Sequence, residues 1–527
     1  MVFLAHIFVE ARRKYQPRTT RQQAVLWVMG WLLVSGFSAP VPPQLATPAE
    51  QPAASGPAVE QLTANSRRAY AEVLKLRLGP ARALLQLELA STPAAPAPLL
   101  VANSADFAEL VISQDTRRYE ELIESQEAHL DALDQAPASA LRNYAQAEIT
   151  IHLGLSQLLF KHLVVGGYHL RHGYQQMQAV VKQYPSFAPA RKTLGICQFA
   201  IGSLPEGYHW LLRLLGLTAD VDAGLQNLAF AAAQPSDFQT ESQIYLALIR
   251  EGYYKRPEES LRLIERLHAQ QPDNLLFSYL LLSVHKRQHH GDAALADYRA
   301  RPAGPGYLPV AYLHHMAADL LLYQGDYLGS ERENLTFLRQ YAGRHYRKDT
   351  AFKLYLAAWL GGQPAATVAR YREQINQPGP TEIEEDNYAQ HYYHEGQMLN
   401  PILTRARLQI DGGYNQLALF TLRSFHATPT VLLRDQIEEP YRRARAYMGL
   451  NRPDSARFYF ERTLSLSGTA APYYFAPQAA LELGYMAQRA GKKAQARAYF
   501  EQALGYPLHE YKNSTDAKAN LALRELK

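Results

Sequence analysis

The stretch LGYMAQRAGKKAQARAYFEQALGYP, residues 483–507, carries the pattern of small and large side chains that decides the fold. Gly484 and Ala496 are small, so two antiparallel helices that carry them can approach closely, and Phe500 fills the space beside the contact. Gly491 supplies the turn between the two helices. The stretch therefore predicts one helical hairpin.

Two stretches upstream repeat this scheme. They are ARAYMGLNRPDSARFYFERTL, residues 444–464, and RARLQIDGGYNQLALFTLRSF, residues 405–425. Their small residues keep a similar spacing, because Ala418 precedes Ala456 by 38 positions and Ala456 precedes Ala496 by 40. Three matches at similar spacing predict a repeated unit of two helices.

Over residues 400–510 the chain resembles the tetratricopeptide repeat (TPR) superfamily, whose units are helical hairpins with this small-and-large pattern. The resemblance implies a right-handed superhelical array of antiparallel helix pairs, a TPR-like α-solenoid. Looser matches of helix, turn and helix occur at residues 244–274, 280–300 and 316–341. The closing residues 511–527 predict a terminal capping helix.

The rest of the chain after residue 61 also predicts helices. Leu, Ala, Tyr and Arg recur at three-and-four spacing, and alternating β-branched runs are almost absent. We therefore expect an all-α fold with an atypical helical N-terminal half. The predicted regions are a signal peptide or signal anchor (1–39), a Pro/Ala-rich linker (40–61), an N-terminal helical region (62–235), divergent TPR-like repeats (236–376), and C-terminal TPR repeats with the capping helix (388–527).

The charge distribution argues against a nucleic-acid partner. The chain carries a net charge of +5, but its basic excess lies in residues 1–38, where Lys and Arg outnumber the single Glu. The remaining body is nearly neutral, whereas nucleic-acid binders carry a basic face. We therefore expect no nucleic acid among the partners.

The N-terminal segment predicts export. AVLWVMGWLLVSGFSA, residues 24–39, is an apolar run behind basic residues, and Gly36 and Ser38 suit the −3 and −1 positions of a cleavage site. The run is shorter than the ~20 residues of a typical membrane span. A cleaved signal, an uncleaved anchor and a buried N-terminal helix are all open. Either membrane reading places the body in the periplasm or cell envelope, secreted or anchored through the N-terminus.

Cys197 is the only cysteine of the chain. An exported chain with one cysteine forms no internal disulfide and depends on packing for its stability. Because Cys197 lies on the apolar face of ARKTLGICQFAIG, residues 190–202, we expect a small core residue rather than a nucleophile.

Residues 202–225, GSLPEGYHWLLRLLGLTADVDAGL, predict a tightly packed helical corner. Gly216 suits the left-handed end of one helix, and Asp220 suits the cap of the next. Gly224 removes a side chain and so permits close contact with a neighbouring helix. The segment resembles part of the tetratricopeptide repeat protein 39 family. That resemblance implies a helical repeat protein acting near membranes, and it supplies no functional residues.

Histidines and carboxylates are the candidates for chemistry. The sets are His315 with Asp319, His391 with His394 and Glu395, His162, His169 and His172 scattered around a glycine-broken helix, and the acidic Glu382, Glu384, Glu385 and Asp386. None has the H-E-x-x-H spacing or a second ligand pair typical of a metal site. We expect surface or satisfied core histidines and a solvated acidic loop, with no metal, no cofactor and no catalytic residue.

These patterns favour a non-catalytic TPR scaffold of the cell envelope that binds a protein or peptide partner in a helical groove. They do not identify the binding residues. The alternative is a helical-toroid hydrolase or metal-dependent enzyme that uses residues 382–395. A third hypothesis is a structural envelope protein that associates with itself. The chain would associate with a membrane through its N-terminal apolar segment.

Overall fold

The computed structural model describes residues 61–203, 220–254, 257–396, 398–428, 430–468, 472–507, 509 and 511–526. These residues form 24 α-helices and one short 3-10 helix, with no strand among them. The expectation of an all-α fold is confirmed. The predicted signal segment (1–39) and most of the linker (40–61) lie outside the described residues, so their assignment stays a prediction.

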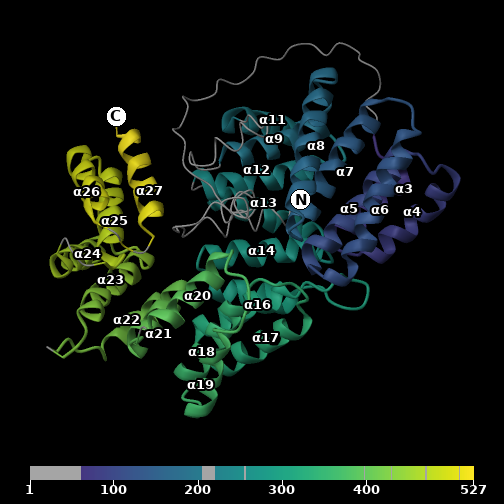
Figure 1. Ribbon diagram of the computed structural model, residues 1–527. Coiled ribbons are helices and arrows are strands. Elements are labelled where there is room, and N and C mark those ends of the chain that lie inside the picture. The colour runs from purple at the N-terminus through teal and green to yellow at the C-terminus, as the bar shows by residue number, and fades with distance from the viewer. Residues whose placement is uncertain are drawn as a thin grey trace.

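Helices of the N-terminal half follow one another as packed neighbours (Figure 1). They are α3 (Ala64–Leu74), α4 (Leu78–Ser91), α5 (Pro96–Ser113), η2 (Thr116–Arg118), α6 (Tyr119–Asp134), α7 (Ala140–Leu159), α8 (Leu163–Gln183), α9 (Ala188–Gly202), α11 (Val221–Ala233), α12 (Gln239–Tyr254) and α13 (Pro257–Gln270). Within the described part of the chain, no helix is both long and apolar enough to cross a membrane.

The chain continues through a middle section into a C-terminal array, seen at the left of Figure 1. The middle helices are α14 (Leu275–Arg287), α15 (Gly291–Ala300), α16 (Tyr312–Gln324), α17 (Tyr327–Gln340), α18 (Arg347–Leu360), α19 (Ala365–Gln374) and α20 (Glu384–Glu395). The array comprises α21 (Pro401–Asp411), α22 (Asn415–Leu422), α23 (Leu433–Gly449), α24 (Pro453–Ser467), α25 (Phe475–Arg489), α26 (Lys493–Gly505) and α27 (Lys512–Glu525).

Helix pairs stack with the first helix of each pair on one side. In the C-terminal array, α21 contacts α23, α23 contacts α25, and α25 contacts α27, whereas no comparable contact joins the described second helices α22, α24 and α26. The N-terminal half repeats the rule, because α3, α5, α7, α9 and α12 contact one another in order. These first helices therefore form one continuous layer, which we call the inner layer, and the helices of the N-terminal half also follow one another in pairs.

The C-terminal pairs pack as their residues predict. Ala456, Ala496 and Phe500 are fully buried. A Cβ placed on Gly484 would lie 2.4 Å from a ring carbon of Phe500, so the large ring occupies the space that the missing side chain leaves. Helix α27 packs on α25 and α26, which confirms the predicted terminal helix.

Glycines bring α9 and α11 of the N-terminal half into backbone contact. A Cβ on Gly224 of α11 would lie 2.6 Å from the backbone nitrogen of Phe199 in α9. A Cβ on Gly195 would lie 2.7 Å from the carbonyl oxygen of Gly224. The predicted close contact of Gly224 is therefore confirmed. Asp220 also caps α11 as predicted, because its side chain accepts a hydrogen bond from the Asp222 amide. Residues 204–219, which include the predicted stop at Gly216, lie outside the described residues.

The expected break at the glycines of residues 162–174 is wrong. Helix α8 runs without interruption from Leu163 to Gln183. A Cβ on Gly173 would lie 2.9 Å from the backbone nitrogen of Ile151, and one on Gly166 would lie 2.9 Å from the carbonyl oxygen of Gly154. These glycines permit α7 and α8 to pack closely, and the packing offsets their low helix propensity.

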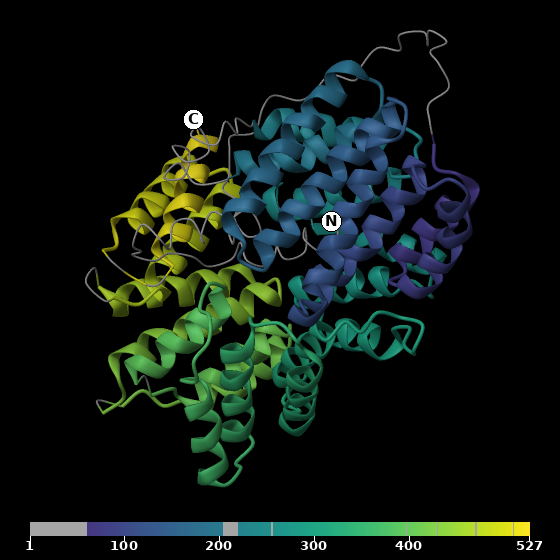
Figure 2. The same ribbon diagram turned by 45° about the vertical axis from the view of Figure 1, so that its right-hand side comes forward.

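Long-range contacts join the two halves. The Leu308 amide donates to the Leu76 carbonyl at 2.7 Å, which ties the loop after α15 to the turn after α3. The Gly291 amide donates to the Gly412 carbonyl at 3.1 Å, which docks the C-terminal array on α15. In both views α18 and α19 project from the body (Figures 1 and 2).

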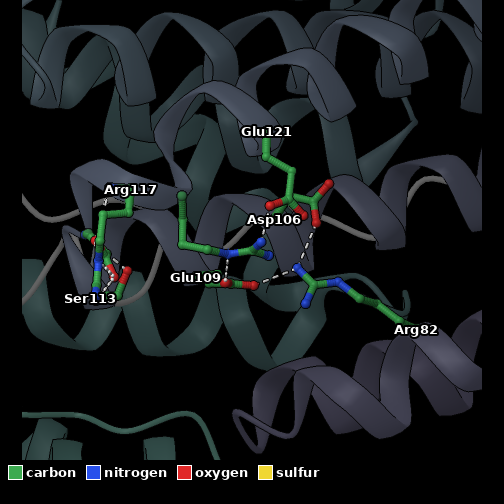
Figure 3. A network of polar contacts seen from close by, with 8 residues as sticks. Arg82, Asp106, Glu109, Ser113, Arg117 and Glu121 are labelled. Carbon is green, nitrogen blue, oxygen red and sulfur yellow. Dashed lines mark hydrogen bonds and ion pairs between the residues drawn. The ribbon is translucent and has the colours of Figure 1, made fainter.

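Ion pairs join α4, α5 and α6 near the surface (Figure 3). The Arg82 guanidinium lies 2.7 Å from an Asp106 carboxylate oxygen and 2.8 Å from a Glu109 carboxylate oxygen. Arg118, at the start of α6, pairs with the other Glu109 oxygen at 3.0 Å. Because Arg82 and Arg118 are about one-third exposed, we assign this network an orienting role and little stability.

Candidate binding face and buried polar clusters

His315 and Asp319 lie side by side on α16, as their spacing predicts, but their partners are cations. Asp319 is 2.8 Å from the Lys286 ammonium and 2.6 Å from the Lys353 ammonium. Lys353 also pairs with Asp349 at 2.6 Å, and the His315 Nε2 atom lies 3.1 Å from Asp349. We call Lys286, His315, Asp319, Asp349 and Lys353 the Asp319 cluster.

The electrostatics of the Asp319 cluster oppose metal binding. Burial lowers the pKa of His315 and keeps its ring neutral, so two lysines balance the charges of two aspartates. Despite burial, the two lysines hold the pKa of Asp319 well below its usual range. A divalent cation here would have to displace ammonium groups that already neutralise the carboxylates.

The other predicted histidines are dispersed. His391 and Glu395 are exposed on α20, with their nearest charged atoms 4.0 Å apart. His169 contacts Gln157 at 2.7 Å, and His162 stacks on Tyr119. Across the described ranges, no three His, Cys, Asp or Glu residues are arranged to hold a metal ion.

The acidic stretch is not the solvated loop that its composition suggests. Glu384 begins α20, and Asp386 is fully buried in it. The Asp386 carboxylate accepts hydrogen bonds from the backbone amides of Tyr346 at 2.7 Å and Asp349 at 2.9 Å, so it caps the start of α18. Burial raises the pKa of Asp386 to about 7. Glu382, half-buried, pairs instead with Lys161. The stretch therefore joins separate elements.

Cys197 is the core residue that its surroundings predict. It is buried in α9, and burial raises the pKa of its thiol to about 12. The thiol is therefore protonated near neutral pH and unsuited to nucleophilic attack.

The tripeptide Arg-Ala-Arg occurs in two successive units, at residues 405–407 and 443–445, and also at residues 299–301 outside them. The first arginine of each copy donates to a backbone carbonyl at the end of a helix. Arg405 donates to the Leu360 carbonyl at 2.8 Å, and Arg443 donates to the Leu422 carbonyl at 2.9 Å. Each accepting carbonyl belongs to the last residue of a helix, where free carbonyls need donors.

The second arginine of each copy meets a tyrosine hydroxyl. Arg407 donates to the Tyr388 hydroxyl at 3.3 Å, and Arg445 donates to the Tyr441 hydroxyl at 3.4 Å. Tyr441 and the carboxylates of Asp411 on α21 and Glu482 on α25 raise the pKa of Arg445.

Asp411 acts electrostatically on both second arginines, but it forms no ion pair with either. Both are half-buried, and within the described part of the chain neither has a carboxylate at ion-pairing distance. The guanidiniums of Arg407 and Arg445 can therefore accept a carboxylate from a partner.

Arg442 differs because it is already satisfied. It is buried, contacts Glu438 at 2.6 Å and donates to the Tyr474 hydroxyl at 2.9 Å. Arg442 therefore supports α23 and α25. This face was not predicted from the sequence, and the tripeptide alone does not mark it, because a third Arg-Ala-Arg, residues 299–301, stands at the end of α15. In the third unit, Leu483 and Tyr485 flank Gly484, so the face spans two units only.

Comparisons with known proteins give only distant structural matches. No model of a known protein family matches the chain, and no curated protein matches it. Among solved structures, yeast Tom70 aligns at 13% identity over 88% of each chain with a TM-score of 0.31. A human IFIT1 dimer with m7Gppp-AAAA aligns at 13% identity, covering 76% of this chain and 81% of that one, with a TM-score of 0.28.

The TPR domain of P58(IPK) aligns at 12% identity over 81% of this chain and 98% of that one, with a TM-score of 0.22. The resemblance to the tetratricopeptide repeat protein 39 family is not confirmed. The classification follows from the antiparallel pairs, their small-and-large contacts and the inner layer. On these observations the chain is an all-α, TPR-like helical solenoid.

Proposed function

We propose that this chain is a non-catalytic scaffold of the cell envelope that binds a carboxylate-bearing protein or peptide segment along the inner layer of α21 and α23. The observation that carries the proposal is the pair Arg407 and Arg445. These arginines occupy equivalent positions in successive units, and only tyrosine hydroxyls contact them among the described groups.

The chemistry of this face suits a peptide. Planar guanidiniums bind carboxylates through paired hydrogen bonds, and the adjacent tyrosines offer apolar rings with polar rims. The two arginines stand 38 positions apart in sequence, one repeat unit. An extended segment with two acidic groups would engage both units at once.

The envelope location is part of the proposal and rests on the predicted signal segment. The enzymatic alternative at residues 382–395 finds no support from the geometry, because Asp386 caps α18 while Glu382 pairs with Lys161 on another element. Glycosidic hydrolysis needs two carboxyl groups facing one bond.

The test is a crosslinking pull-down from the native envelope fraction with the full-length chain tagged at its C-terminus. We expect a reproducible partner set crosslinked to residues 400–510. The double variant Arg407→Ala, Arg445→Ala should lose that set, because it lacks both guanidiniums that would bind the carboxylates of the partner. Arg497→Ala, an exposed arginine on the outer helix α26, is the matched control. Equal recovery by the double variant and the control would contradict the proposal.

A further inference from the structure

A cavity of about 70 Å³ lies inside the N-terminal half, far from the Arg-Ala-Arg face in sequence. Its walls come from the inner-layer helices α3, α5, α7, α9 and α12, and from α14. The N-terminal half therefore contains a small, partly open chamber between these helices. On this measure a water molecule needs ~10–15 Å³, so the chamber has room for about five to seven non-hydrogen atoms.

One wall of the chamber is a buried charge cluster. The Lys192 ammonium lies 3.2 Å from a Glu148 oxygen and 2.9 Å from a Glu241 oxygen. The Tyr70 hydroxyl donates to the same Glu241 oxygen at 2.8 Å. All four side chains are buried. We call Glu148, Lys192 and Glu241 the Lys192 cluster.

The Lys192 cluster carries an excess negative charge. Two carboxylates face one ammonium, and burial lowers the pKa of neighbouring His152 far enough to keep its ring neutral. Two aromatic rings also lie near the ammonium, because Lys192 is 5.0 Å from the centre of the Phe238 ring and 6.0 Å from that of Tyr144. A buried charge is tolerated when it is paired, so the extra carboxylate calls for a second cation.

Two buried polar atoms of the chamber residues have no hydrogen-bond partner. His152 Nδ1 contacts the Asn103 amide oxygen at 2.7 Å, and the Asn103 amide nitrogen has no partner. In the tautomer with the ring proton on Nδ1, Nε2 is an acceptor. His152 Nε2 lies 3.7 Å from Glu148 and has no hydrogen-bond partner, and the Glu148 Oε2 atom also has none. Both residues line the chamber and are 3% exposed.

The remaining walls are mostly apolar. Leu100, Val111 and Leu276 line the chamber together with Ser104, and Phe107 stacks on the His152 ring at 4.0 Å. A ligand for this chamber therefore needs a cationic donor at one end and a short hydrocarbon at the other.

We propose that the chamber binds a small primary alkylammonium ion. Its ammonium group donates to Glu148 Oε2 and His152 Nε2 and balances the second carboxylate. Its alkyl chain of about three carbons contacts Leu100, Val111 and Leu276. The binding is reversible and involves no covalent step.

The test uses n-propylammonium chloride and the full chain. We expect the melting temperature to rise with propylammonium concentration at constant ionic strength, because a ligand that binds only the folded state stabilises it. The neutral analogue n-propanol, which lacks the charge, should give no such rise. Ligand-observed NMR should show saturation transfer from the protein to the propyl protons.

Glu148→Gln is the deciding variant, because it keeps the shape and removes the excess charge. Propylammonium should bind it at least about tenfold more weakly. The matched control is Glu124→Gln on the exposed side of α6, which changes the net charge equally and should bind normally. A second variant, Val111→Phe, fills the chamber and should also lose binding.

Three outcomes would overturn the proposal. One is an equal response to propanol, which would mean nonspecific apolar binding. Another is unchanged affinity in Glu148→Gln, which would place the ligand elsewhere. The third is no response of the native chain to propylammonium, which would mean that the chamber holds water only.

Discussion

The molecule contains two buried charge clusters that differ in how far their lysines balance their carboxylates. The Asp319 cluster in the middle section joins α14, α16 and α18 with two lysines for two ionised aspartates. The Lys192 cluster in the N-terminal half joins α7, α9 and α12 with one lysine for two glutamates. A chamber opens beside the Lys192 cluster.

The difference separates a structural role from a binding role. A balanced cluster orients its helices and needs nothing more, whereas an unbalanced cluster beside empty space can gain stability from a ligand. Each cluster therefore predicts a different response when one member is removed.

The largest effect should come from Lys192→Met. It removes the only cation of its cluster and leaves two carboxylates buried near each other. We expect a loss of about 3–5 kcal/mol in unfolding free energy, measured by urea denaturation. A loss below that of Lys353→Met would contradict the comparison.

Lys353→Met in the Asp319 cluster should cost less, about 2 kcal/mol, because other partners remain. Asp319 keeps Lys286, and Asp349 keeps His315 at 3.1 Å. We expect His315 to take up a proton in this variant, which NMR titration of its ring protons can detect as a raised pKa.

Asp386 links the Asp319 cluster to pH. Its folded pKa is about 7 and its ordinary value is 3.8, so the folded state holds a proton that the unfolded state releases. The stabilising contribution of the protonated acid is complete below pH 3.8 and is lost as the pH rises through about 7.

Asp386→Asn should remove this pH dependence. At pH 8 the variant should gain about 1 kcal/mol over the native chain, since the avoided ionisation outweighs the loss of one of the two capping oxygens. Near pH 4 the variant should show no gain. Melting temperatures of both proteins across the pH range measure the difference, and parallel curves would refute the assignment.

The smallest effect should come from Glu148→Gln. It leaves Lys192 paired with Glu241, and the new amide can donate to His152 Nε2. We expect a change below about 1 kcal/mol in unfolding free energy. A loss as large as that of Lys192→Met would show that the second carboxylate is required for folding, and the contrast between the clusters would fail.

Local patterns predicted the helical hairpins well. Gly484, Ala496 and Phe500 meet as their spacing requires, and Asp220 caps α11. The glycines of α8 misled the analysis, because a glycine that breaks an isolated helix can equally permit the close approach of a neighbour. The acidic stretch misled it too, since only the tertiary structure places the α18 N-terminus beside Asp386.

The binding residues required more than local patterns. The repeated Arg-Ala-Arg was visible at residues 405–407 and 443–445, yet only the fold shows that one arginine of each copy meets a helix end and the other a tyrosine. The Lys192 cluster left no sequence signal at all, because its members are separated by 44 and 49 positions.

The sequence by itself therefore determined the helices, the turns and the repeated pairs, since these depend on side chains three or four positions apart on one helix face. The tertiary structure decided which charges meet and where space remains. A buried lysine takes its partners from whichever helices the superhelix brings to it, and that choice depends on contacts between units rather than on spacing within one.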